Sequence, residues 1–278
     1  MRPKAQSKFN AETPLKRYVC SFCLIACSFL ALALAGTASA ETLTINAAIN
    51  KAGRQRMLSQ RMAKAYCQAG LGVEVERSKK VLEQSVALFD KQLMELKAFA
   101  PTPEIKDIYA RLEQTWIPYK QLLSGGDPNL DSAKAIARMS EDVLKLAQQG
   151  TILLEKHSGT TMGKLINVAG RQRMLSQRIA KISMFRAWGI ASPQMAQDLD
   201  TATREFATAQ ELLTGAPQNT EAIRRELQLA GSQWLVFEEA LNQTGASRAE
   251  QLRNIATTSE RILQVMDDVT SMYEGMPK

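Results

Sequence analysis

The sequence predicts an all-α protein, built as two tandem antiparallel four-helix bundles that follow a signal peptide. Hydrophobic residues recur at helical spacing, and no alternating run is bounded by hairpin turns. The segment INKAGRQRMLSQRMAK at 49–64 returns as INVAGRQRMLSQRIAK at 166–181, with 14 of 16 positions identical. We call this segment the box. Its recurrence indicates a duplicated unit, and short loops between amphipathic helices indicate bundles.

The N-terminus has the three parts of a secretory signal peptide. Two basic residues at 16–17 precede an apolar run at 18–35, and an Ala-Ser-Ala motif ends at Ala40. Basic start, apolar middle and small-residue cleavage site are typical of export signals. We therefore predict that residues 1–40 are removed and that the mature chain is periplasmic. Two alternatives are an uncleaved membrane anchor, because the run is near the lower limit for a span, and a lipoprotein box at 24–27.

The composition of the mature chain excludes several classes of function. Residues 41–278 carry 30 basic and 27 acidic side chains, a net charge of about +3, which argues against a nucleic-acid partner. No second apolar run of spanning length follows, so the mature chain should be soluble. Cys67 is its one cysteine and His157 its one histidine. We therefore expect no internal disulfide, metal site, catalytic residues or cofactor. Cys67 is either a small buried residue or half of an intermolecular bridge.

Self-comparison divides the mature chain into copy 1, residues 41–157, and copy 2, residues 158–278. The offset of 117 at the box persists more weakly outside it, with small shifts that mark loop insertions. The following matches support it: Phe89 with Phe206, Trp116 with Trp234, Tyr119 with Phe237, and Ser140-Glu141 with Ser259-Glu260.

Each copy is expected to contain four helices. In copy 1, the helix that holds the box should run from about 43 to 69 and end at a Gly-Leu-Gly stop. The second should run from 74 to 99, the third from 104 to 124, and the fourth from just after Pro128 to about 156. Copy 2 should repeat this order over 162–189, 193–214, 219–243 and 247–274.

The joint between the copies is HSGTTMG, residues 157–163. Two glycines and three hydroxyl residues weaken a helix there. The joint is therefore either a hinge, which would let the copies fold side by side, or a mild flaw in one long helix, which would place them end to end.

Within the box, a glycine and an arginine one turn apart suggest a binding position. Gly53 lies in mid-helix, where glycine costs about 1 kcal/mol relative to alanine but lets another group approach the backbone. Arg56 follows at i+3, so its guanidinium can reach the space above Gly53. A guanidinium is planar and forked, and suits a planar oxyanion. Leu58 and Met62 should face the bundle core instead.

The polar residues of the box recur in both copies, although the rest of the sequence has diverged. Asn50, Arg54 and Arg61 share another side of the helix. Solvated arginines with ordinary salt bridges are one explanation, but packing alone does not require the identity of exposed polar residues. We therefore favour a binding role. The candidate ligand-binding residues are Gly53, Arg56, Gly170 and Arg173, supported by Asn50, Arg54, Arg61, Asn167, Arg171 and Arg178.

The pattern Asn-x-Ala-Gly-x-x-Arg-Met-x-Ser-x-Arg resembles the P-box of the nitrate/nitrite sensor kinases NarX and NarQ. Its fuller form is similar to the N-terminal domain of the type IV pilus chemotaxis transducer PilJ. The resemblance implies a periplasmic four-helix sensor bundle whose Gly-x-x-Arg arginine, here Arg56 and Arg173, binds the ligand at a two-fold interface between first helices. Arg54 and Arg171 replace a non-arginine position of the nitrate sensors, which leaves the ligand's identity open.

Two functions follow from these observations. The first is an exported binding module for a small oxyanion, nitrate or nitrite, in which the two copies mimic a sensor dimer. The alternative is a helical partner of a membrane-bound sensor, a pilus-linked chemotaxis system or another copy of itself, which docks through exposed polar stripes of the box helices. The resemblance implies membrane helices and a signalling module as well. None follows Lys278, so we expect the chain to depend on a partner for signalling.

Overall fold

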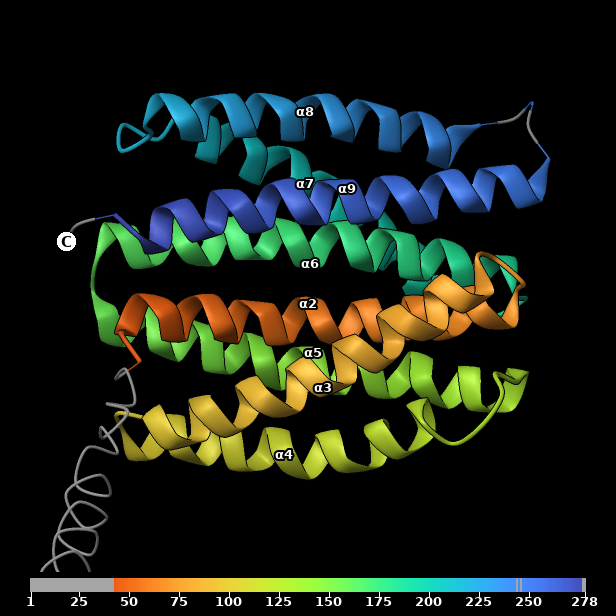
Figure 1. Cartoon of the computed structure of the whole chain (residues 1–278), viewed down its shortest axis with the longest axis horizontal. Coiled ribbons are helices and arrows are strands. Elements are labelled where there is room, and N and C mark those ends of the chain that lie inside the picture. The colour runs from red at the N-terminus through yellow and green to blue at the C-terminus, as the bar shows by residue number, and fades with distance from the viewer. Residues whose placement is uncertain (1–42, 244, 246, 277–278) are drawn as a thin grey trace, which may run out of the picture. The chain divides into compact units, whose positions relative to one another are not determined.

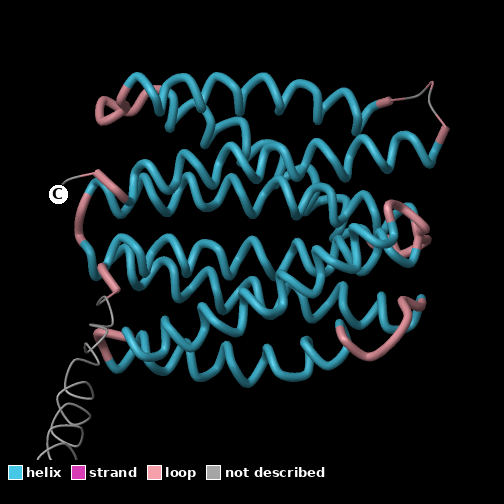
Figure 2. Tube along the Cα trace, in the orientation of Figure 1, coloured by secondary structure: helices cyan, strands magenta, loops and turns pink. Residues whose placement is uncertain are grey.

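A computed structural model describes residues 43–243, 245 and 247–276, and these residues form eight α-helices without a strand (Figures 1 and 2). The predicted all-α class is confirmed, and each helix boundary lies within two residues of the predicted one. The predicted signal peptide lies outside the described residues. The helices are α2 (Ile45–Gly70), α3 (Val75–Phe99), α4 (Pro103–Leu123), α5 (Leu130–Ser158), α6 (Thr161–Ala187), α7 (Pro193–Thr214), α8 (Glu221–Asn242) and α9 (Arg248–Glu274).

Polar caps explain where most of the helices begin. The side chain of Thr44 accepts a hydrogen bond from the backbone N–H of Ala47 and so satisfies one of the unpaired donors of the first turn of α2. α4 and α7 also have proline in the first turn, where its missing N–H costs nothing. The other caps of this kind are Thr102, Asn129, Thr160, Ser192, Thr220 and Ser247.

The outer helices of the two copies are packed by equivalent aromatic side chains. Phe89 of α3 stacks on Trp116 of α4 with ring centroids 4.0 Å apart. Phe206 of α7 stacks on Trp234 of α8 at the same distance. Both tryptophans are almost fully buried. The internal duplication is therefore visible in the packing as well as in the sequence.

The two box helices, α2 and α6, lie side by side and run in the same direction (Figure 1). Near their N-terminal ends, the Cδ1 atom of Ile49 lies 3.1 Å from the position of a Cβ on Gly163. Near their C-terminal ends, Gly70 packs against the indole of Trp188. The extensive contact between α2 and α6 joins the described residues of both copies into one compact unit. The division into domains at residue 157 stays a prediction.

The chain reverses at the joint between the copies. α5 runs antiparallel to α2. The start of α5 lies beside the C-terminal end of α2, where the backbone N–H of Asn129 donates to the Tyr66 hydroxyl at 3.2 Å. α5 ends at Gly159 in the left-handed conformation, with φ of 63°, and Thr160 caps the start of α6. The flaw in one long helix is therefore the wrong interpretation, and the side-by-side arrangement is the correct one.

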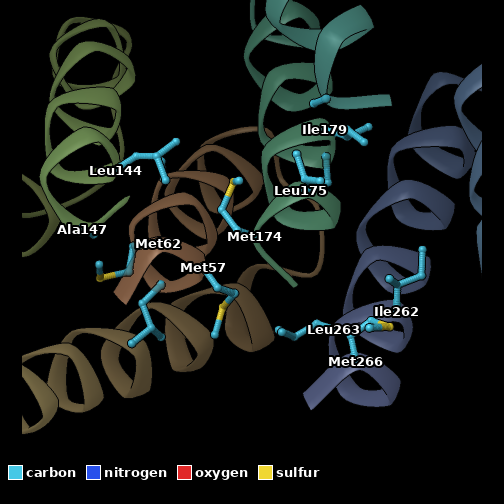
Figure 3. Close-up of a cluster of buried hydrophobic side chains, with 14 of the residues drawn as sticks. Met57, Met62, Leu144, Ala147, Met174, Leu175, Ile179, Ile262, Leu263 and Met266 are labelled. Atoms are coloured by element: carbon cyan, nitrogen blue, oxygen red, sulfur yellow. The ribbon is translucent and has the colours of Figure 1, made fainter. Parts of the chain in front are cut away.

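A shared hydrophobic core lies between the four inner helices. Figure 3 shows side chains from α2, α5, α6 and α9 gathered in this region, including Met57 and Met62 of the first box. Met62 is fully buried, and so is Leu58. Both face the core, as predicted. The methionines of the box are thus packing residues, and this core supports both copies at once.

Candidate functional site

The candidate site lies where the backbones of the two box helices are in contact, at Gly53 and Gly170. An ideal Cβ on Gly53 would lie 3.7 Å from the Cα of Gly170, and one on Gly170 would lie 3.8 Å from the Cα of Gly53. Equivalent residues of the two copies therefore face each other, which is the geometry of an isologous two-fold interface. Glycine at both positions permits this approach because it has no side chain to separate the helices.

Both box arginines reach over both glycines. The Nη2 atom of Arg56 lies 3.1 Å from the Cβ position of Gly53 and 3.3 Å from that of Gly170. The Nη2 atom of Arg173 lies 3.4 Å and 3.1 Å from the same two positions. The sequence-based expectation about the reach of Arg56 therefore matches the structure. Whether these four residues bind a ligand stays a prediction.

The two guanidinium groups are fully buried and cross between the copies. The Nη2 atom of Arg56 donates to the backbone oxygen of Asn167 at 3.1 Å, and that of Arg173 donates to the backbone oxygen of Asn50 at 3.3 Å. Within the described part of the chain, the buried Nε of each arginine has no hydrogen-bond acceptor. Each guanidinium group thus has one N–H, at Nε, that is free to donate a further hydrogen bond.

Burial makes both cations costly. Removal from water, together with the charges of Arg171 and Arg173, lowers the pKa of Arg56 to about 9. Burial lowers the pKa of Arg173 to about 10, although Asp267 opposes the change. Because two like charges lie close together away from water, a negative charge placed between them would stabilise both.

The predicted supporting residues surround this centre. The side-chain amide of Asn50 donates to Glu274, and that of Asn167 donates to Glu155, so equivalent pairs hold both asparagines. The partly exposed Arg54 and Arg171 bind different carboxylates. Arg54 donates to Asp267 at 2.7 Å, and Arg171 donates to Glu205 at 2.7 Å.

Further along the box helices, a lysine and an arginine of each copy share one carboxylate from the other copy. Lys64 and Arg61 bind Glu260 of α9, at 2.6 Å and 2.5 Å. Lys181 and Arg178 bind Glu141 of α5. Arg61 and Arg178 are therefore brought to the interface, but they serve these ion pairs and not the centre at the glycines.

The sequence analysis did not identify the roles of Lys64, Lys181, Glu141 and Glu260. A signal was present, since the Ser-Glu pair at 140–141 recurs at 259–260 while its surroundings diverge. The serines take part as well. The ammonium of Lys64 donates to the hydroxyl of Ser259 at 3.0 Å, and that of Lys181 donates to Ser140 at 3.1 Å.

The polar stripes of the box are mostly buried, so the expectation of an exposed docking stripe is wrong for these residues. Gln55, Ser59 and Gln60 have no exposed surface, and Arg54 and Arg61 are only partly exposed. Backbone carbonyls of neighbouring helices accept hydrogen bonds from the side-chain amide nitrogens of the glutamines: that of Gln60 donates to the oxygen of Ser140 at 3.0 Å. A buried amide N–H needs such an acceptor, which explains why a donor side chain recurs at these positions in both copies.

The described residues contain no group of three or more His, Cys, Asp or Glu side chains that could hold a metal ion. None of the described helices is both long and apolar enough to cross a membrane. Cys67 is buried, and burial raises the pKa of its thiol. A small buried core residue, one of its two predicted roles, is what the structure shows.

Comparison with known proteins identifies one family. The profile described as "Type IV pili methyl-accepting chemotaxis transducer N-term", PilJ, matches residues 38–145 and again residues 157–262. Comparisons with curated proteins and with solved structures return no match. The two matches contain one box each and cover most of the chain. The chain therefore belongs to the family of N-terminal domains of type IV pili methyl-accepting chemotaxis transducers, and it carries this sensory helical domain twice.

Proposed function

We propose that this protein is an exported sensory module that binds one small planar oxyanion, nitrate or nitrite, between its two copies. The observation that carries the proposal is the pair of fully buried guanidinium groups of Arg56 and Arg173, which meet over Gly53 and Gly170. Buried cations are retained when they have a partner. An anion bound here would supply the negative charge that the neighbouring cations favour.

The geometry around the glycines supports a small ligand. The Cβ position of each glycine lies 3.1 to 3.4 Å from one Nη2 atom of each arginine. The Nη2 atoms of both arginines therefore converge over the same two glycines, and an oxygen atom that bridged them could accept hydrogen bonds from both guanidinium groups. A planar ion with several oxygens matches two planar, forked donors.

The supporting residues would position the arginines. Asn50 and Asn167 accept hydrogen bonds from Arg173 and Arg56 through their backbone oxygens, and Arg54 and Arg171 add positive charge at the edge of the site. The resemblance to the nitrate sensors supplies the choice of nitrate and nitrite. Arg61 and Arg178 would act indirectly, by holding the copies together.

Binding would strengthen the contact between α2 and α6, because an anion between two guanidinium groups removes their repulsion. A ligand that binds only the folded state stabilises it by about 2.7 kcal/mol at a concentration of 100 Kd. The tightened unit would then be recognised in the periplasm by a membrane-bound sensor or a chemotaxis component, in keeping with the family's description as a transducer domain.

Calorimetry and thermal melting of the exported chain with sodium nitrate and sodium nitrite test the proposal. We expect heat of binding and a melting temperature that rises by several degrees in millimolar anion. Arg56→Lys keeps the charge but loses the fork, so it should abolish both signals. Arg61→Lys, a matched change outside the centre, should retain them. Absence of heat and of any shift with both anions would refute the proposed function.

A further inference from the structure

The two halves of the site are equivalent in position but not in charge. Counting from the repeated Ser-Glu pair, Gln148 of α5 occupies the place that Asp267 occupies in α9. The contacts agree with this equivalence. The Nη1 atom of Arg56 donates to the side-chain oxygen of Gln148 at 2.6 Å, and the Nη1 atom of Arg173 donates to the carboxylate of Asp267. One arginine therefore binds a neutral amide and the other binds an anion.

A second difference points the same way. The side-chain oxygen of Asn50 accepts a hydrogen bond from Nη2 of Arg173 at 2.7 Å. The side-chain oxygen of Asn167, at the equivalent place, is buried and has no donor among the residues that the structure describes. Arg173 thus has three acceptor atoms, one of them charged, whereas Arg56 has two neutral ones.

These contacts leave Arg56 without a carboxylate in direct contact. Arg56 and Arg173 are both fully buried, and between them they contact a single carboxylate, that of Asp267. The flanking arginines add positive charge to the centre: Arg54 shares Asp267 with Arg173, and the charge of Arg171 helps to lower the pKa of Arg56. Glu155 and Glu274 bind the asparagine side chains instead, and they act on Arg56 and Arg173 only at longer range.

We infer, on the basis of the proposed function, that Arg56 is the main partner of the bound anion and that Asp267 restricts the site to a single monovalent oxyanion. Asp267 neutralises Arg173 whether or not the ligand is present. One further negative charge then balances Arg56. A divalent oxyanion such as sulfate would bring a second charge that is repelled by Asp267 and has no buried cation left to balance it.

The test compares the two near-isosteric changes that exchange the charges of the equivalent positions. Wild-type protein should bind one nitrate per chain, at least about tenfold more tightly than sulfate at the same ionic strength. Asp267→Asn frees the second guanidinium, so the preference for nitrate over sulfate should shrink by about tenfold or more. Gln148→Glu gives Arg56 its own carboxylate, so nitrate affinity should fall by about tenfold or more.

Thermal melting without oxyanion supplies a second, ligand-free measurement. Gln148→Glu should raise the melting temperature, because it gives the buried Arg56 a carboxylate in direct contact, and Asp267→Asn should lower it, because it takes one from Arg173. Binding of neither nitrate nor nitrite by the wild-type chain would overturn the proposed function together with this inference. Nitrate binding that neither variant changes by more than about twofold would overturn the inference alone. So would equal wild-type affinity for nitrate and sulfate. If Asp267→Asn does not fold, Gln148→Glu still decides the role of Arg56.

Discussion

The ion pairs between the copies predict a large loss of stability when Glu260 is replaced by glutamine. The carboxylate of Glu260 binds Lys64 at 2.6 Å and Arg61 at 2.5 Å, and the side chain of Lys64 is only 1% exposed. Burial alone would raise the pKa of Glu260, but Lys64 and Arg61 outweigh it and lower the pKa from 4.5 to about 2. A change of this size corresponds to about 3 kcal/mol of stabilisation of the charged carboxylate in the folded state.

Glu260→Gln removes this stabilisation and also leaves the Lys64 ammonium buried without its counter-charge. Breaking a buried pair in this way costs about 3–5 kcal/mol. For a chain of this size each kcal/mol corresponds to about 2–4 °C, so the melting temperature should fall by roughly 6–20 °C. The matched control is Glu95→Gln, which breaks the more exposed pair between Lys51 and Glu95 and should cost less than about 1 kcal/mol.

The lowered pKa of Glu260 also predicts how the stability difference between wild type and Glu260→Gln changes with pH. Because folding lowers the pKa of Glu260, its contribution is complete above the unfolded value of 4.5 and is lost as the pH falls toward about 2. The stability difference between wild type and Glu260→Gln should therefore be constant near neutral pH and should shrink below pH 4.5. Urea unfolding at pH 7 and at pH 3 measures both quantities. If Glu260→Gln lowers the free energy of unfolding at pH 7 by no more than Glu95→Gln does, the argument that buried ion pairs stabilise the contact between the copies is refuted.

Two glycines give further predictions about the contact between the copies. Gly70→Ala should destabilise the protein by about 1–3 kcal/mol in urea unfolding, because its Cβ would lie 2.0 Å from the ring of Trp188. Gly215→Ala, at a helix end with ordinary contact distances, should be close to neutral. Gly159→Ala should cost about 1–2 kcal/mol, because Gly159 has φ of 63° at the joint. Equal stability of the Gly70→Ala and Gly215→Ala variants would contradict the prediction for Gly70. Unchanged stability of the Gly159→Ala variant would contradict the prediction for Gly159.

Periodicity and end signals were sufficient to predict the helices, since caps, prolines and glycines act locally. They were also sufficient for the core positions of Leu58 and Met62. They failed for the polar residues of the box. Gln55 and Gln60 have the composition of an exposed face, and they are buried because carbonyls of neighbouring helices accept their hydrogen bonds. Such partners are distant in sequence, so no local pattern reveals them.

The duplication also explains why the two halves of the site can differ. In a dimer of identical chains every substitution appears twice, so a carboxylate opposite one arginine would appear opposite the other as well. In a single chain that carries both copies, Gln148 and Asp267 can diverge independently. The contacts that hold the copies together have stayed equivalent: Lys64 with Glu260 on one side, Lys181 with Glu141 on the other. The partners of the two arginines have diverged, whereas the partners of the two lysines have remained the same. This pattern is expected when the interface must keep its geometry while the charge at its centre changes.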